Sequence, residues 1–186
     1  GPGIVGWPLP FAELRLVDET GCDVPAGHTG ELWLRGPQRF AGYLHDASRT
    51  AEAITSDGWF RSGDLMSRDP DGAYRVRGRR KEMYISGGEN VYPAEVESVL
   101  LGHEDIAEVV VIGVPDDRWG EVGCAVVRLK GARTLVIGDL RAWARERLAA
   151  YKVPHHVRVV DALPRLGSGK VDRSAVAREV RPPMPG

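Results

Sequence analysis

The sequence predicts an α+β protein with a strand-rich first part and a mixed second part. Residues 1–77 contain runs in which polar and apolar side chains alternate, the period of a half-buried strand. From about residue 79 onward, β-branched runs alternate with segments of helical spacing. The 186 residues suffice for one ordinary domain or two small ones, and a composition of 42% hydrophobic and 27% charged residues is typical of a packed globular protein.

Several classes of protein are excluded by composition. The formal net charge of −1 argues against a non-specific nucleic-acid binder. No apolar stretch approaches the roughly 20 residues of a membrane helix, and the first residues lack a signal peptide's basic and apolar regions. Cys22 and Cys124 are too far apart for a disulfide framework or a zinc ribbon. We therefore expect a reduced, cytoplasmic protein without a membrane span or a nucleic-acid partner.

The first part reads as mostly antiparallel strands with one short helix. Alternation predicts strands at 13–17 and 31–35, and the turn-forming residues 69–72 precede a third at 73–76. Asp46 is a plausible N-cap for a helix over residues 47–54.

The second part alternates strands and helices, with a boundary near Gly78-Arg79. Pro93 stands at the first position of a predicted helix over 94–101. Asp139 is expected to cap a second helix, and Ser174 could cap a last short one. The predicted strands are residues 109–112, 125–129 and 157–160.

Three segments hold more glycine and polar residues than packing requires, and the first is residues 58–65. It places Asp64 directly after a glycine, at the expected end of a strand. A carboxylate there can accept hydrogen bonds from neighbouring hydroxyls, such as a ribose diol. The alternative is a turn in which Asp64 caps its own backbone, and this octamer alone favours that alternative.

The second segment, residues 78–93, combines the cationic triplet Arg79-Arg80-Lys81 with the pair Gly87-Gly88. Such a triplet is usually a solvated face, and paired glycines usually form a plain turn. Paired glycines also let another molecule approach the backbone closely. On an extended segment Arg79 and Lys81 point the same way. This matters at a domain boundary, because a charged residue there can exchange partners as the two domains move.

The third segment, residues 163–173, carries Lys170 on a glycine-flanked loop. It does not have the spacing of a Walker phosphate loop, nor that of a dinucleotide-binding fingerprint. A mobile ammonium can act as a point charge on phosphate and carboxylate oxygens. The alternative, favoured by this segment alone, is an ordinary solvated lysine in a turn.

The sequence offers no convincing metal site or cysteine nucleophile. His155 and His156 are adjacent and would diverge on a strand, and the other histidines lack partners at ligand spacing. Neither cysteine has a nearby histidine to activate it. We expect these residues to be structural.

Taken together and in order, the three segments resemble the C-terminal third of the ANL superfamily, which comprises acyl-CoA synthetases, adenylation domains of peptide synthetases and beetle luciferases. The resemblance covers almost the whole chain and extends to residues 3–8, 30–37, 42–43 and 150–154. It implies a β-barrel-like last subdomain of the AMP-binding large domain over 1–77, a hinge over 78–81 and a small C-terminal lid domain over 82–180. The composition of residues 181–186 predicts a disordered tail.

The resemblance also implies roles for the candidate residues. Asp64 would hold the ribose hydroxyls of ATP and of the acyl-adenylate, and Arg79 would add a second contact near that ribose. Lys170 would bridge the substrate carboxylate and the α-phosphate during adenylation, where two anionic groups need neutralising charge.

The remaining implied roles concern the second half-reaction. Lys81 falls at the hinge about which the lid swings between half-reactions. Gly87 and Gly88 would line the pantetheine tunnel after that swing. Ser62 stands where threonine is commoner in the family, a change that keeps the hydroxyl.

The implied reaction has two steps. A carboxylic acid, fatty or aryl, and ATP with Mg²⁺ give an acyl-adenylate and pyrophosphate, and a thiol then displaces AMP. Residues 85–93 are most similar to acyl-CoA ligases, so the expected thiol is CoA. The phosphate loop, the adenine and magnesium motifs and the acyl pocket are expected in an N-terminal portion of the large domain that this sequence does not contain, so the chain alone is expected to be inactive.

Two alternatives stay open. The ending Lys170-Val171-Asp172-Arg173 is shared with adenylation domains that load a carrier protein. A truncated, lid-like module that binds a nucleotide or a partner without catalysis is the other.

Overall fold

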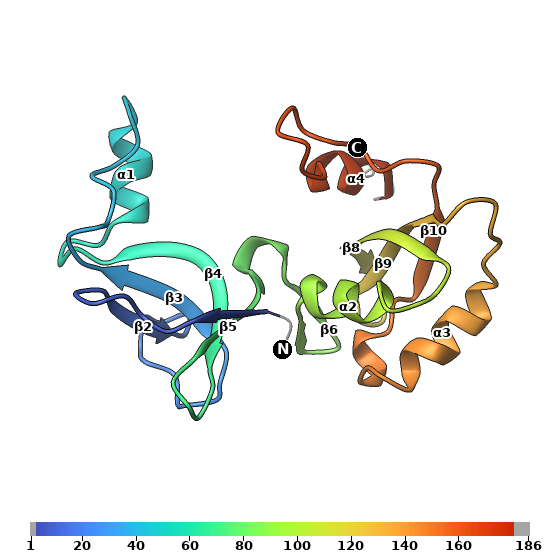
Figure 1. Cartoon of the computed structure of the whole chain (residues 1–186), viewed down its shortest axis with the longest axis horizontal. Helices are drawn as coiled ribbons and strands as arrows, with labels where there is room; N and C mark the ends of the chain where they lie inside the picture. Colours follow the sequence, from blue (N-terminus) through green and yellow to red (C-terminus); the bar gives the residue numbers. More distant parts are fainter. Residues whose placement is uncertain (1–2, 181–186) are drawn as a thin grey trace. The chain divides into compact units, whose positions relative to one another are not determined.

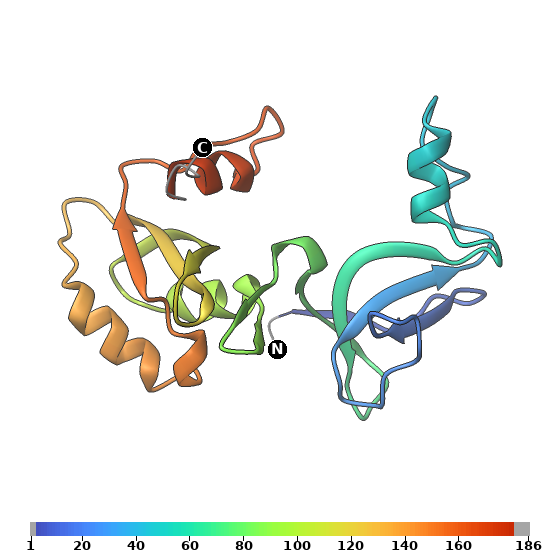
Figure 2. The ribbon, with the colours of Figure 1, turned by 180° about the vertical axis from the view of Figure 1, so that it is seen from behind.

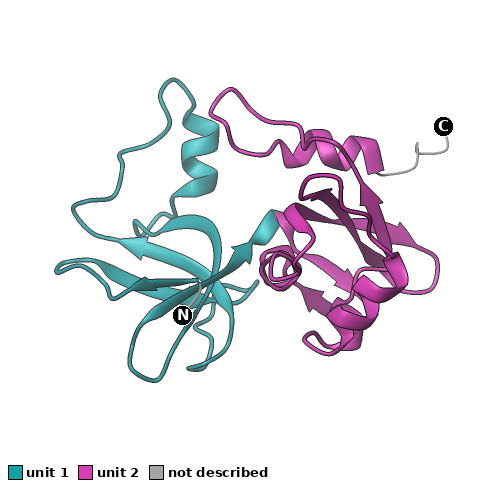
Figure 3. Ribbon diagram, turned by 45° about the vertical axis from the view of Figure 1, so that its right-hand side comes forward, with its two compact units in different colours: residues 1–81 teal, residues 82–186 magenta. Residues whose placement is uncertain are grey.

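The computed structural model describes residues 3–180, which form two compact units, one ending at Lys81 and the other beginning at Glu82 (Figure 3). Each unit has its own sheet and its own hydrophobic core (Figure 1). The predicted α+β class is confirmed. The predicted disordered tail, residues 181–186, lies outside the described residues.

The first unit is an antiparallel sheet in the order β1-β5-β4-β3-β2. Leucines alternate along β2 and β3 onto one face, where they pack with Met66 and Tyr74. The sheet is strongly curved (Figure 2), and within residues 3–180 its edge strands β1 and β2 are not paired with each other. The elements of this unit are β1 Ile4–Gly6, β2 Glu13–Val17, β3 Gly30–Arg35, α1 Ala47–Ala53, β4 Phe60–Arg68 and β5 Tyr74–Arg79.

The second unit is a mixed sheet in the order β10-β9-β6-β7, with β8 also paired to β9. Strand β10 runs parallel to β9, and β8 runs antiparallel to it. The elements are β6 Tyr84–Ser86, β7 Glu89–Val91, α2 Pro93–Leu100, β8 Ile106–Asp116, β9 Gly120–Leu129, α3 Ile137–Arg145, β10 His156–Val159 and α4 Arg173–Val180. Single 3₁₀ turns lie at Arg80–Glu82 and Ala150–Lys152.

Strand β8 is buried on both faces, which explains its continuous β-branched run. Val109 and Val111 point into a core shared with α2 and α3. Val110 and Ile112 point into a second core, under α4. The sheet therefore separates α4 from α2 and α3 (Figure 2).

The predicted strands and helices are present, with two corrections at helix starts. Helix α3 begins at Ile137 after Val136, so Asp139 lies in its first turn and does not cap it. Helix α4 begins at Arg173, and the Asp172 side chain, rather than Ser174, accepts from the Ala175 amide at 3.0 Å. Within residues 3–180, no helix is long and apolar enough to cross a membrane.

Candidate functional site

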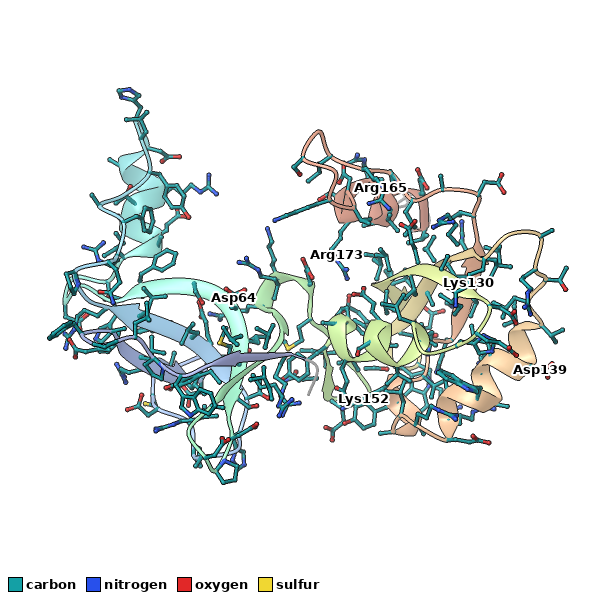
Figure 4. The ribbon with its side chains drawn as sticks, viewed as in Figure 1. Asp64, Lys130, Asp139, Lys152, Arg165 and Arg173 are labelled. Carbon is teal, nitrogen blue, oxygen red and sulfur yellow. The ribbon has the colours of Figure 1, made fainter. Side chains whose placement is uncertain are left out.

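Asp64 and Arg79 face each other across strands β4 and β5. Arg79 Nε lies 2.7 Å from Asp64 Oδ1, and Arg79 Nη1 donates to the Ser62 carbonyl at 3.3 Å. Figure 4 shows Asp64 on β4. The Asp64 side chain is 28% exposed and that of Arg79 is 52% exposed, so both reach solvent. The pair therefore presents an acceptor and a donor side by side, a combination that suits the two hydroxyls of a ribose.

The local backbone at Asp64 differs from both sequence interpretations. Asp64 lies inside β4, so it neither ends a strand nor caps its own turn. The preceding Gly63 has a φ of +72°, and β4 bulges there against β3. The Ser62 hydroxyl accepts from the Asp64 amide at 3.0 Å and donates to the Leu32 carbonyl at 2.7 Å. The hydroxyl that serine retains thus braces the bulge.

Glu31 is a buried carboxylate that the sequence pattern did not single out. Its Oε1 accepts from the Gly63 amide at 3.1 Å, and its Oε2 pairs with Arg80 Nη1 at 2.9 Å. Glu31 thereby ties the bulge to the residue before Lys81. The cationic triplet at residues 79–81 was a sequence signal that a carboxylate partner exists. It could not identify Glu31, which lies 49 residues from Arg80 along the chain.

Lys81 is exposed and is the last residue of the first unit. It lies in the 3₁₀ turn Arg80–Glu82, so the expected extended segment, with Arg79 and Lys81 on one side, is wrong. A short 3₁₀ turn between compact units is a common connector. The role of residues 78–81 as a hinge stays a prediction.

Gly87 and Gly88 form the two-residue turn between β6 and β7, and we call residues 84–91 the glycine hairpin. Their φ values of +60° and +87° are both positive, as a tight hairpin turn of this length requires. The turn prediction is confirmed. A side chain at Gly87 would lie 2.8 Å from Trp119 Cε3, whereas one at Gly88 would meet nothing within 4 Å. The direction in which a side chain would project is therefore blocked at Gly87 and open at Gly88.

Trp119 packs against the hairpin from the loop between β8 and β9. Its carbonyl accepts from the Gly87 amide at 2.9 Å. The Asp116 carboxylate accepts from the amides of Arg118 and Trp119 at 2.9 Å each, and these backbone hydrogen bonds lower the pKa of Asp116. The loop is thus an anchor for the hairpin, found only once the fold is known.

Tyr84 anchors the other end of the hairpin in a slot with glycine walls. Gly113 and Gly123 are paired across β8 and β9. A Cβ at Gly123 would lie 2.5 Å from the Tyr84 hydroxyl, and one at Gly113 would lie 2.5 Å from Tyr84 Cβ. Burial raises the pKa of the Tyr84 phenol above its ordinary value. The Ile85 amide beside it donates to Glu121 Oε2 at 3.2 Å.

Lys170 lies on an exposed loop before α4, and we call residues 164–172 the lysine loop. The Leu166 amide donates to the Lys170 carbonyl and the Gly169 amide donates to the Leu166 carbonyl, both at 2.8 Å. Arg165 and Val171 form an isolated antiparallel bridge at the base. Within residues 3–180 the Lys170 ammonium has no ion-pair partner, so its charge is available to an anionic ligand.

The described residues offer no group of three or more His, Cys, Asp or Glu side chains that could hold a metal ion. Cys124 is buried, and burial raises the pKa of its thiol. A thiol held protonated is a poor nucleophile.

Profiles of two families match this chain. Residues 95–170 match the AMP-binding enzyme C-terminal domain, and residues 1–44 match the AMP-binding enzyme family. The chain is 47% identical to a feruloyl-CoA synthase from Amycolatopsis sp over 176 residues, which is 95% of this chain and 36% of that protein. It is 46% identical to the indoleacetate–CoA ligase of Aromatoleum aromaticum over 178 residues, 96% of this chain and 35% of that protein.

A solved structure agrees with these matches. The amide bond synthetase McbA from Marinactinospora thermotolerans superposes with a TM-score of 0.89 at 36% identity, over 97% of this chain and 36% of that one. The chain thus spans about a third of the length of the proteins it matches.

Proposed function

The chain belongs to the ANL superfamily of AMP-binding enzymes, as the counterpart of the C-terminal third of acyl-CoA ligases, and from this premise we propose that the complete protein is an AMP-forming acid–thiol ligase. The observation that carries the proposal is 47% identity, over 95% of the chain, to a protein named as a CoA synthase. A match over 95% of the chain includes the glycine hairpin and the lysine loop, which supports carrying their roles over.

The substrate that we propose is an aromatic carboxylic acid. The two relatives described above are named for ferulic and indoleacetic acids, and a further relative at 45% identity is a 2-succinylbenzoate–CoA ligase. All three acids carry an aromatic ring, and the acid named for two relatives at 48% and 47% identity carries saturated fused rings. Each of these five relatives is named for a ring-bearing acid, which supports a ring-bearing acid over a straight-chain fatty acid.

In the proposed first half-reaction, a carboxylate oxygen of the acid attacks the α-phosphorus of ATP and pyrophosphate leaves. Asp64 and Arg79 bind the ribose hydroxyls. The Lys170 ammonium contacts the carboxylate and the α-phosphate, where it offsets the repulsion between two anions. The described residues do not supply a magnesium site, so we assign any Mg²⁺ ligands, with the phosphate loop and the acyl pocket, to the part of the family's length outside this chain.

In the proposed second half-reaction, the sulfur of CoA attacks the acyl carbon and the carbon–oxygen bond to AMP breaks. Gly87 and Gly88 line the passage for the pantetheine arm, and the open side of Gly88 leaves room for it. Lys81 acts as the pivot about which the lid moves between the two half-reactions. Many enzymes close a lid in this way about a few hinge residues.

The test is to incubate the complete protein with ATP, CoA and ferulate, and to measure AMP release and the acyl-CoA product by mass spectrometry. We expect both products in equal amounts. The 186-residue chain alone should give no pyrophosphate exchange. Robust exchange by the chain alone, or no adenylate from the complete protein with any aromatic acid, would overturn the proposal.

The acceptor needs its own comparison. Free CoA, a phosphopantetheinylated carrier protein and a simple amine can each be supplied to the preformed adenylate. The amine arm is included because McbA is named as an amide bond synthetase. Preferential transfer to the carrier or to the amine would reject CoA as the acceptor, while adenylate binding without transfer to any of the three acceptors would favour a non-catalytic module.

A further inference from the structure

We propose that Arg165 and Arg173 are positioning residues that fix the two ends of the lysine loop and thereby set the reach of Lys170. This inference rests on the proposed function, because it assigns a purpose to the position of the ammonium. The two arginines lie at the entry and exit of the loop, next to and within α4 (Figure 4).

Arg165 ties the entry of the loop to the sheet. Its Nη1 donates to the Gly169 carbonyl at 2.8 Å, directly before Lys170. Its Nη2 pairs with Glu108 on β8, whose other contact is Arg128 on β9 at 2.6 Å. One guanidinium therefore joins the backbone at Lys170 to two strands of the core sheet.

Arg173 ties the exit of the loop to three elements. Its Nη1 donates to Glu97 Oε1 on α2 and its Nη2 donates to the Val111 carbonyl on β8, both at 2.8 Å. Its Nε lies 3.3 Å from Glu82 Oε2, on the first residue of the second unit. The side chains of Arg173 and Glu97 are 24% and 16% exposed, so solvent screens this pair less than a surface pair.

Glu97 is itself held in place, because the same Oε1 accepts from the Val111 amide at 2.8 Å. The planar guanidinium of Arg173 meets fixed acceptors on two elements, which a flexible lysine could not do in one geometry.

These contacts fix the position of the Lys170 backbone, which determines how far its ammonium can reach. Lys170 lies five residues after Arg165 and three before Arg173, so its backbone moves with both anchors. The ammonium stem has four flexible carbons and no ion-pair partner within residues 3–180, so the backbone position decides where the charge can go. A misplacement of about 1 Å can cost about 100-fold in rate.

The first experiment uses the 186-residue chain and needs no activity. Arg165→Gln and Arg173→Gln are compared with wild type by amide hydrogen exchange at Leu166 and Gly169, the two donors inside the loop. We expect exchange to be about tenfold faster at one or both amides, because a hydrogen bond to a charged group is worth roughly a factor of ten or more. Arg133→Gln is the matched control. Arg133 Nη1 lies 2.9 Å from Asp105 Oδ1, and neither residue belongs to the lysine loop. Unchanged exchange, or the same change in the control, overturns the proposal.

The second experiment uses the complete protein and separates positioning from folding. In both Gln variants we expect adenylate formation to fall about 10- to 100-fold, while thioester formation from preformed adenylate changes by less than about twofold. Arg165→Lys keeps the charge but cannot serve both Gly169 and Glu108, so it should give an intermediate loss. Equal loss in both half-reactions would show a structural role alone and overturn the proposal. If the wild-type protein forms no adenylate, the proposed function fails, and the exchange experiment still judges the two anchors.

Discussion

The glycine hairpin and the lysine loop belong to the same compact unit, yet different interactions hold them. The hairpin is fixed by its own tight turn, with the positive φ values of Gly87 and Gly88, and by close packing in the slot around Tyr84. The lysine loop is fixed by ion pairs to residues 57 and 76 positions away along the chain. Close packing holds the first region in place, and charged hydrogen bonds hold the second.

This difference suits the proposed chemistry. A passage for the long, uncharged pantetheine arm needs a backbone that the arm can approach closely and that moves little. Glycines next to a packed slot supply both properties. A charge that must reach an anion needs a free side chain on a fixed base. The two regions therefore should fail in different ways when they are changed.

The largest expected effect is that of Lys170→Ala in the complete protein. We expect adenylate formation to fall by about 10²- to 10³-fold, the usual cost of removing one charge-stabilising group. Thioester formation from preformed adenylate should be largely kept, because the proposed second half-reaction uses Gly87 and Gly88 and does not use Lys170. Pyrophosphate exchange and single-turnover thioester formation measure the two steps. Lys130→Ala, which removes another exposed lysine of the same unit, is the control, and equal loss in both steps would reject the assignment.

Packing at the base of the hairpin gives the next prediction. Gly123→Ala would place a Cβ 2.5 Å from the Tyr84 hydroxyl and should lower the free energy of unfolding by ~1–3 kcal/mol. Gly167→Ala, in the lysine loop, would meet nothing within 4 Å and should change it little. Urea unfolding midpoints at constant slope measure both. If the two substitutions cost the same, the hairpin does not depend on its slot.

The sequence predicted those features that neighbouring residues decide. The Gly87-Gly88 turn, the strand periods and the proline at the start of α2 are local signals, and the structure confirms them. The sequence also singled out Asp64, Arg79 and Lys170, and the structure places Asp64 beside Arg79.

The misses depend on partners that are distant along the chain. No local pattern relates Arg173 to Glu97, and Trp119 meets Gly87 only after β8 and β9 have paired. The bulge at Gly63 kept Asp64 inside a strand where a glycine suggested an end. Each miss is a case in which tertiary contacts decided what local preference left open.

The connection between the units gives a smaller effect. Lys81→Pro should slow mainly the second half-reaction, by about tenfold, or about 1.4 kcal/mol of barrier. Proline fixes its own φ and disfavours the helical backbone of the preceding Arg80, which stiffens the proposed pivot. Lys81→Ala keeps the backbone free and serves as the control. Measuring both half-reactions decides the point, since a parallel fall in each would reject a pivot at this position.

The smallest expected effect is a pH dependence on the hairpin side. The His155 amide donates to the Gly123 carbonyl, which brings this histidine next to the Tyr84 slot. Burial is the largest cause that lowers the pKa of His155 below its ordinary 6.5, with Arg141 adding to it and Asp116 opposing it.

Because the folded-state pKa is the lower one, the unfolded chain takes up the proton first as the pH falls. Folding stability should therefore decrease from about pH 7 down to the lowered value and then level off. His155→Gln should remove that slope in urea unfolding, whereas His156→Gln, at an exposed position, should keep it. In hydrogen exchange below pH 6.5, the Ile85 amide of the hairpin should lose protection in the wild type while the Leu166 amide of the lysine loop does not. Equal loss at both amides would mean that protonation weakens the whole unit and that the two regions are not independent.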